Sequence, residues 1–285
     1  MTFRSSHTVI LAAALLLPVS LSAQQPAPVT ELSPGALLFA TAAGNVVAVV
    51  TPEGAFIAGP LSAASTAGIQ AEISRRTRSP VRYVVAAPRL MAQSEGDGGW
   101  GRLGAMVATH EDAWGRLSDP ARLAASGSAA PVAAFSEVLK FDLAGHGIHV
   151  VHQKAGFSDA DFLVHFESDG LVYLGESLPG DGYPTIDAEQ HGTLDGLIQT
   201  LGPWTRNGAH FVPARGPVET SSDVMAFRDM LVLMQRRIRA LAQAGQTVEQ
   251  VIAAHPSAEY DARFGHGRVG ADAFVREVYG SVAGH

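Results

Sequence analysis

Cysteine is absent from the 285 residues of this chain. No disulfide can therefore brace the fold, and an oxidising compartment poses no hazard to it. Stability must come from an ordinary hydrophobic core. A chain of this length with 47% hydrophobic residues can supply such a core as one large domain.

Long runs of lysine and arginine are also missing, and the formal net charge is −7. Nucleic acid and anionic membrane surfaces attract proteins through concentrated positive charge. We therefore expect neither as a partner.

Apolar runs long enough to cross a bilayer are missing as well. The longest run near the N-terminus, Val9–Leu17, follows the single charge of Arg4 and ends at Pro18. It is about half as long as the roughly 20 residues that a membrane helix needs. This layout is typical of a secretory signal peptide, and we expect cleavage near Ala23. The resulting prediction is a signal peptide over residues 1–23 and an exported, periplasmic or secreted chain without stable membrane insertion.

Short apolar runs bounded by turn residues predict a strand-rich chain with inserted helices. The predicted strands cover residues 37–40, 45–50, 55–58, 81–86, 105–108, 138–143, 148–152, 161–166 and 170–174. The predicted helices of this part cover residues 63–76 and 111–117. These elements indicate an α/β chain in which helices flank two sheets within one domain.

The C-terminal part, residues 221–285, is predicted to be a helical tail. Apolar residues recur from Val224 at spacings of three and four, and Ser221-Ser222-Asp223 is expected to cap this helix. Thr247 and Gln250 have the spacing of a capping box and predict a second helix. The predicted organisation is thus a linker over 24–32 and a domain over 33–285.

Several segments of the second half carry a resemblance to a known family. They are Asp159–Phe166, Gly170–Glu176, Tyr183–Asp187, Phe211–Val218, Gly245–Ile252 and Glu259–Ala262. Together they resemble the metallo-β-lactamase superfamily, in particular its exported branch of broad-specificity zinc hydrolases with a long C-terminal helical tail. The resemblance covers nearly all of the mature chain. It implies a four-layer αββα sandwich followed by helices.

A working member of that family binds one or two zinc ions through histidines and aspartates. These ligands leave a position for water, whose pKa the metal lowers to about 7. At the four ligand places of the His-x-His-x-Asp-His motif, this sequence has Pro88, Leu90, Ala92 and Gln93. Phe157 stands in the place of the later His, Glu176 in that of the bridging Asp and Arg215 in that of the last His. No histidine or cysteine lies anywhere from Ser79 to Thr109. The family implies zinc as cofactor, whereas for this chain we expect neither zinc nor another metal.

Two of these positions predict a specific contact. Glu176 and Arg215 stand where the family places two ligands of one metal pair, so we expect them to form an ion pair in place of the metal. A guanidinium can satisfy a carboxylate through two parallel hydrogen bonds. The alternative is that Arg215 extends into solvent. Gly59 takes the place of the strand-end Asp that braces the family's site from behind.

The remaining polar candidates favour structural roles. His146, His149 and His152 form the densest histidine group, but strand alternation places His149 on the opposite face from the other two. His110 is expected to open a helix together with the acidic residues after it. Asp161 is expected to hydrogen bond across its loop.

The run from Glu95 to Gly101 contains Asp97 and Trp100 among glycines, at the family's cleft edge. Trp100 could serve as a stacking platform for a ligand, or could pack on a neighbour; both interpretations stay open. Asp159 and Asp161 are further candidates for cleft residues, because the family also has acids there.

Three hypotheses for the function follow. The first is a catalytically inactive protein of this fold, exported, that binds a small molecule or a protein partner in the vestigial cleft. The second is a hydrolase with an altered site that uses Glu176, Asp159, Asp161 or His152. The third is a structural subunit that pairs with an active relative. A serine hydrolase is not supported, since the sequence has no Gly-x-Ser-x-Gly elbow.

Overall fold

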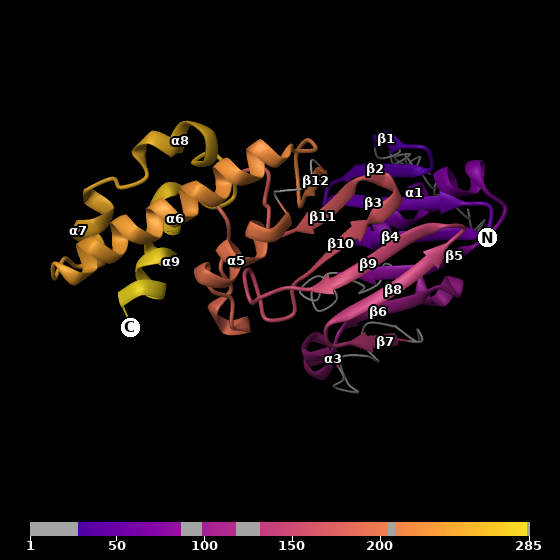
Figure 1. Ribbon diagram of the computed structural model, residues 1–285, viewed down its shortest axis with the longest axis horizontal. Helices are drawn as coiled ribbons and strands as arrows, with labels where there is room; N and C mark the ends of the chain where they lie inside the picture. The colour runs from indigo at the N-terminus through magenta and orange to yellow at the C-terminus, as the bar shows by residue number, and fades with distance from the viewer. Residues whose placement is uncertain (1–27, 87–98, 118–131, 205–208, 284–285) are drawn as a thin grey trace, which may run out of the picture.

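The computed structural model describes residues 28–86, 99–117, 132–204 and 209–283. Two mixed β-sheets pack face to face, and helices cover parts of their outer faces (Figure 1). Further helices gather at one side of the sandwich and form the C-terminal tail. The predicted architecture of two sheets flanked by helices is confirmed.

In the part of the chain that the structure describes, sheet A contains seven strands in the order β1-β2-β3-β4-β5-β6-β7. Its first four strands pair antiparallel, and β4 to β7 pair parallel. The strands are β1 (Val29–Ser33), β2 (Ala36–Thr41), β3 (Gly44–Thr51), β4 (Gly54–Gly59), β5 (Val81–Ala86), β6 (Met106–His110) and β7 (Val132–Phe135).

Sheet B, as far as the described residues show it, contains five strands in the order β12-β11-β10-β9-β8. Strands β8 to β11 pair antiparallel, and β12 joins β11 in parallel. The strands are β8 (Val138–Leu143), β9 (His146–His152), β10 (Phe162–Phe166), β11 (Leu171–Gly175) and β12 (His210–Pro213). The parallel pair matters for the site, because the loops after β11 and β12 leave the sheet at the same edge.

The helices of the sandwich are α1 (Ala63–Arg76), α3 (Glu111–Leu117) and α5 (Leu194–Trp204), with short 3-10 turns η1 (Gly101–Leu103), η2 (Glu167–Asp169) and η3 (Ala188–Gln190). The tail contains α6 (Ser221–Gln243), α7 (Val248–Ala253), α8 (Ala258–Phe264) and α9 (Ala271–Ala283). In the part of the chain that the structure describes, no helix combines the length and apolar character that crossing a bilayer needs.

Among the described residues, three hydrophobic clusters hold these layers together. One lies between the sheets and includes Phe56, Val164 and Tyr173. A second joins sheet A to α1 through Ile69 and Ile73. The third joins sheet B to α5, α6 and α9. The alternation of buried residues along each strand thus divides the apolar side chains between two faces.

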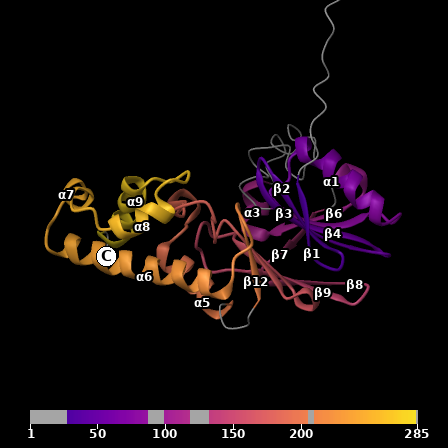
Figure 2. The same ribbon diagram turned by 90° about the horizontal axis from the view of Figure 1, so that it is seen from above.

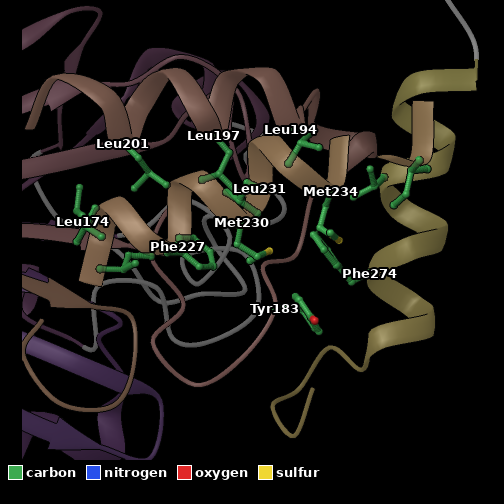
Figure 3. Packing of buried hydrophobic residues seen from close by; sticks show 14 of the residues in the cluster. Leu174, Tyr183, Leu194, Leu197, Leu201, Phe227, Met230, Leu231, Met234 and Phe274 are labelled. Carbon is green, nitrogen blue, oxygen red and sulfur yellow. The ribbon is translucent and has the colours of Figure 1, made fainter. Parts of the chain in front are cut away.

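The tail is fixed to the sandwich by the third cluster. Phe227 and Leu231 of α6 lie beside Leu197 of α5 (Figure 3). Tyr183, from the loop after β11, stacks on Phe274 of α9 with ring centroids 4.4 Å apart. Seen from above, the long helix α6 extends away from the sheets, and α7, α8 and α9 lie beside it (Figure 2). The loop that follows β11 is therefore held by the tail as well as by its own strand.

The element boundaries correct the sequence analysis at two places. Residues Val29–Ser33 form the edge strand β1, so the predicted linker over 24–32 is wrong for its last four residues. The sequence of these residues has only a weak apolar pattern, and they form a strand because they pair with β2. Helix α6 is capped by Thr220, which forms a capping box with Asp223, whereas Ser221 and Ser222 belong to the first turn. The predicted signal peptide lies outside the described residues.

Candidate functional site

Three of the positions at which the resemblance places the family's metal ligands are described, and they lie on three loops at one end of the sandwich. Phe157 lies between β9 and β10, Glu176 directly follows β11, and Arg215 follows β12 by two residues. Gly175 and Pro213 are paired across β11 and β12. Because β11 and β12 are parallel, Glu176 and Arg215 lie close together just after the ends of these strands. Their proximity was predicted.

Glu176 and Arg215 form the predicted ion pair. Nη1 of Arg215 lies 3.2 Å from Oε1 of Glu176, and each side chain is 21% exposed. The second terminal nitrogen of Arg215 donates to the carbonyl oxygen of Ala43 at 3.1 Å. The guanidinium is thus not directed into solvent, and the alternative interpretation is wrong.

A second arginine, which the sequence analysis missed, completes this arrangement. Nη2 of Arg268, in the loop between α8 and α9, lies 3.2 Å from Oε2 of Glu176. Each carboxylate oxygen of Glu176 therefore has its own guanidinium. Arg268 is distant in sequence and lies in no motif, so only the docking of the tail reveals it.

Close backbone contacts hold both arginines in place. Tyr183 donates its N–H to the carbonyl of Phe264 at 3.1 Å, which fixes the tail loop against the loop after β11. A Cβ on Gly182 would lie only 2.8 Å from Cα of Gly267, so the two loops meet where neither has a side chain. The N–H of Arg215 donates to the carbonyl of Pro179 at 3.1 Å.

Gly59, where the resemblance places the family's bracing aspartate, leaves no room for a side chain. Its φ is +142°, and a Cβ would lie 2.7 Å from the carbonyl oxygen of Asn45 and 2.9 Å from Cα of Val46. The buried side chain of Asn45 instead donates to the carbonyls of Pro213 and Gly216, at 3.0 and 2.9 Å. An amide thus connects sheet A to the loop that carries Arg215.

Phe157 and Asp161 organise the loop before β10. Phe157 is buried at 5% exposure, where the family would place an imidazole. Its N–H donates to Oδ2 of Asp161 at 2.7 Å, and the hydroxyl of Ser158 donates to Oδ1 at 2.7 Å. Burial raises the pKa of Asp161 to about 7, although both hydrogen bonds act in the opposite direction. The predicted structural role of Asp161, hydrogen bonding across its loop, is confirmed.

Asp159 has a different environment from Asp161. Its Oδ2 lies 2.8 Å from Nδ1 of the exposed His191, and its carbonyl oxygen lies 2.8 Å from Nε2 of His152. The two aspartates therefore have separate partners and do not converge on one cation site.

The histidines of β6 and β9 have structural contacts. His152 stacks on His110 between the sheets, with ring centroids 3.8 Å apart, and Nε2 of His110 lies 2.9 Å from the carbonyl oxygen of Ser136. His146 contacts Asp169 at 3.1 Å through Nδ1. His110 is the last residue of β6 and α3 begins at Glu111, so the prediction that His110 itself opens the helix is wrong by one residue.

Trp100 does not line a cleft. It is 1% exposed and belongs to the cluster between sheet A and α1. The interpretation as a stacking platform is therefore wrong, because the large ring is used to fill that core. Asp97 and the first four motif positions, Pro88, Leu90, Ala92 and Gln93, lie outside the described residues.

The donor set at the described positions does not fit the family's zinc pair. Phe157 has no donor atom in its side chain, Arg215 is a cation, and both oxygens of Glu176 contact guanidinium groups. Among residues 28–86, 99–117, 132–204 and 209–283, no group of three or more His, Cys, Asp or Glu side chains could hold a metal ion.

Comparison with known proteins gives structural but no sequence matches. No family model matches the chain, and neither does any curated protein sequence. A metallo-β-lactamase from Pontibacter korlensis is 16% identical with a TM-score of 0.59, covering 72% of this chain and 98% of its own. The DIM-1 metallo-β-lactamase is 11% identical with a TM-score of 0.56, covering 72% and 96%.

A longer similarity is found to the stereoselective inverting sec-alkylsulfatase Pisa1 from Pseudomonas sp. It is 11% identical with a TM-score of 0.67 and covers 89% of this chain. The chain spans 50% of that enzyme's length. Identities this low establish the fold alone. The two mixed sheets, the flanking helices and these structural neighbours together show that the chain has the metallo-β-lactamase fold.

Proposed function

We propose that this chain is a catalytically inactive protein of the metallo-β-lactamase fold that acts outside the cytoplasm by binding a ligand at the end of the sandwich. The observation that carries this proposal is the contact of Glu176 with both Arg215 and Arg268. A cation site needs unpaired oxygen or nitrogen donors, and here two positive groups take the place of the cation. The names of the structural neighbours describe those proteins, and fold alone does not transfer their activities.

A hydrolase with an altered site has weaker support, because each of its candidate groups has another role. Glu176 is paired with two guanidinium groups. Asp161 is buried and accepts two hydrogen bonds within its own loop. His152 contacts the carbonyl of Asp159. A perturbed carboxyl pKa is a sign of catalytic sites, but in Asp161 it arises from burial in a structural loop.

A structural subunit that pairs with an active relative would need an apolar surface on the tail. Helix α6 exposes Met225 at 49% and Val232 at 38%. Asp229, between them on this side of the helix, is exposed too. These residues do not form a continuous apolar patch, so the tail does not favour this hypothesis.

The ligand that fits best is a small molecule with an anionic group. Arg268 is 55% exposed, and its guanidinium carries more N–H donors than the contact with Glu176 uses. A planar guanidinium binds carboxylate, phosphate or sulfate groups through paired hydrogen bonds. The exported location belongs to this proposal and rests on the N-terminal sequence pattern alone.

The inactive state can be tested by hydrolysis assays. The purified mature protein is incubated with a chromogenic β-lactam and a simple aryl ester, with and without added zinc. We expect no turnover above background, because no zinc-bound hydroxide can form at neutral pH without the histidine cluster. Metal-dependent turnover that persists in Glu176→Ala would overturn the proposal.

Ligand binding can be tested by thermal unfolding in the presence of carboxylate, phosphate and sulfate compounds. We expect at least one compound to raise the Tm of the wild type and to lose this effect in Arg268→Met. Arg237→Met is the control, since Arg237 pairs with Glu259 in the tail at 3.0 Å. Equal shifts in both variants, or no shift with any compound, would contradict anion binding at this site.

A further inference from the structure

Part of sheet B's outer face is left uncovered by the described helices. Helices α5 and α6 lie beside the β11 and β12 side of the sheet, whereas β8 and β9 lie open in Figure 1. Register pairing places Lys140, His149 and His165 in one row across β8, β9 and β10. This row lies on the opposite face from Ile148 and Val150, which belong to the core between the sheets.

Two imidazoles thus become direct cross-strand neighbours. His149 and His165 are paired residues of antiparallel strands, and their ring centroids lie 6.1 Å apart. The planes meet at 67°, so the rings do not stack. The side chain of His149 is 28% exposed, which leaves it accessible from solvent.

The carboxylate of Glu167 lies next to the two imidazoles because Gly147 has no side chain to block it. A Cβ on Gly147 would lie 2.7 Å from Oε2 of Glu167, so the glutamate side chain crosses strand β9 over this residue. Oε2 of Glu167 lies 3.9 Å from Nε2 of His149. Gly147 and His149 share one face of β9, and Glu167 therefore brings negative charge next to the imidazole pair.

The geometry is close to that of a chelate. With metal–nitrogen bonds of about 2.0–2.1 Å and a near-tetrahedral angle, two imidazoles on one ion have ring centres about 5 Å apart. The observed separation exceeds this value by about 1 Å, which a small side-chain rotation can close.

We propose that His149 and His165 bind one divalent transition cation, such as Zn²⁺ or Cu²⁺, on the outer face of sheet B, with Glu167 adding negative charge beside it. Imidazole is a preferred ligand of both ions. Two protein ligands form this site and water completes the coordination, in keeping with the lack of a larger donor group among the described residues.

The site is separate from the proposed ligand site. His149 and His165 lie on strands β9 and β10, whereas Glu176 and Arg215 follow β11 and β12 at the end of the sandwich. Lys140 is paired with His149 on the same face and opposes cation binding, while Asp142, paired with Gly147, favours it. A cation held here would not restore the family's catalytic centre.

Isothermal titration of the mature protein with zinc chloride tests this proposal. We expect one site in the wild type, loss of that site in His149→Ala and in His165→Ala, and weaker binding in Glu167→Gln. His146→Ala is the matched control, because His146 belongs to the same strand but contacts Asp169. We expect that variant to bind as the wild type does.

Imidazole NMR signals of the wild type provide a measure that needs no variant. Zinc should shift the signals of His149 and His165 together and leave those of His110 and His152 in place. Absence of a zinc site, or a site that survives both alanine substitutions, would overturn the proposal. Zinc binding that depends on Glu176 instead would place the ion at the end of the sandwich, and would also contradict the inactive state proposed above.

Discussion

The ion pair between Glu176 and Arg215 allows a quantitative test. Removing one partner of a deeply buried pair costs about 3–5 kcal/mol, whereas an exposed pair contributes about 0–1 kcal/mol. Both side chains here are 21% exposed. In Arg215→Met the second oxygen of Glu176 keeps its contact with Arg268. We therefore expect this substitution to lower the free energy of unfolding by about 1–2 kcal/mol, between the two limits.

Glu176→Gln should cost more than Arg215→Met. The guanidinium of Arg215 then keeps its hydrogen bond to the Ala43 carbonyl but loses the carboxylate that balances its charge. The double variant should lose less than the sum of the two single changes, because neither charge is then left unpaired. We expect a coupling energy of about 1 kcal/mol, which is typical of residues in direct contact.

Urea unfolding of the four proteins, followed by tryptophan fluorescence, measures this cycle. The pair Arg237–Glu259 in the tail is the control, since its side chains are more exposed, at 35% and 52%. The same cycle there should give a smaller coupling energy. Strictly additive effects at Glu176 and Arg215 would show that the contact contributes nothing, and the reasoning from burial would be refuted.

Three further predictions concern the loop before β10, the end of β4 and the N-terminus. Because burial raises the pKa of Asp161 to about 7, its protonated form favours the folded state, and this contribution should decline as pH rises from about 4 to 7. In Asp161→Asn that part of the pH dependence should disappear from urea unfolding curves; an unchanged pH profile would exclude Asp161 as its source. Gly59→Asp should destabilise by more than the roughly 1–3 kcal/mol of backbone strain alone, because its Cβ meets the Asn45 carbonyl. Gly104→Asp is the control, since its φ is +92° but no atom lies within 4 Å of the added Cβ; equal losses of stability would argue against the collision. Mass spectrometry of the exported chain should find an N-terminus close to Gln24, whereas an intact Met1 in the membrane fraction would indicate an anchor.

The helices and strands that the sequence predicted best are those with a strong local signal. Helix α1 begins and ends at the predicted residues, Ala63 and Arg76, because Ser62 caps it and apolar residues recur with helical spacing. Strand β8 also has the predicted bounds. Strand β1 was missed, since an edge strand with few apolar residues takes its structure from its neighbour. Helix α5 was not predicted either; it contains two glycines and ends in Pro203-Trp204.

The candidate site, too, was predicted in part. The resemblance placed Glu176 and Arg215 at two ligand positions of one metal pair, and this was the basis for predicting that they meet. Strand β12 and its parallel pairing with β11 were not predicted from the sequence. Their opposite charges then predicted an ion pair, because a carboxylate and a guanidinium at neighbouring positions attract each other.

Only the tertiary structure could decide three other features. Arg268 reaches Glu176 because the tail folds back on the loop after β11, and His149 meets His165 because β9 and β10 pair in one particular register. Trp100 is buried because the layer between sheet A and α1 has room for a large ring. Such contacts join residues from separate elements, and a local pattern sets the shape of each element but not which element packs against it.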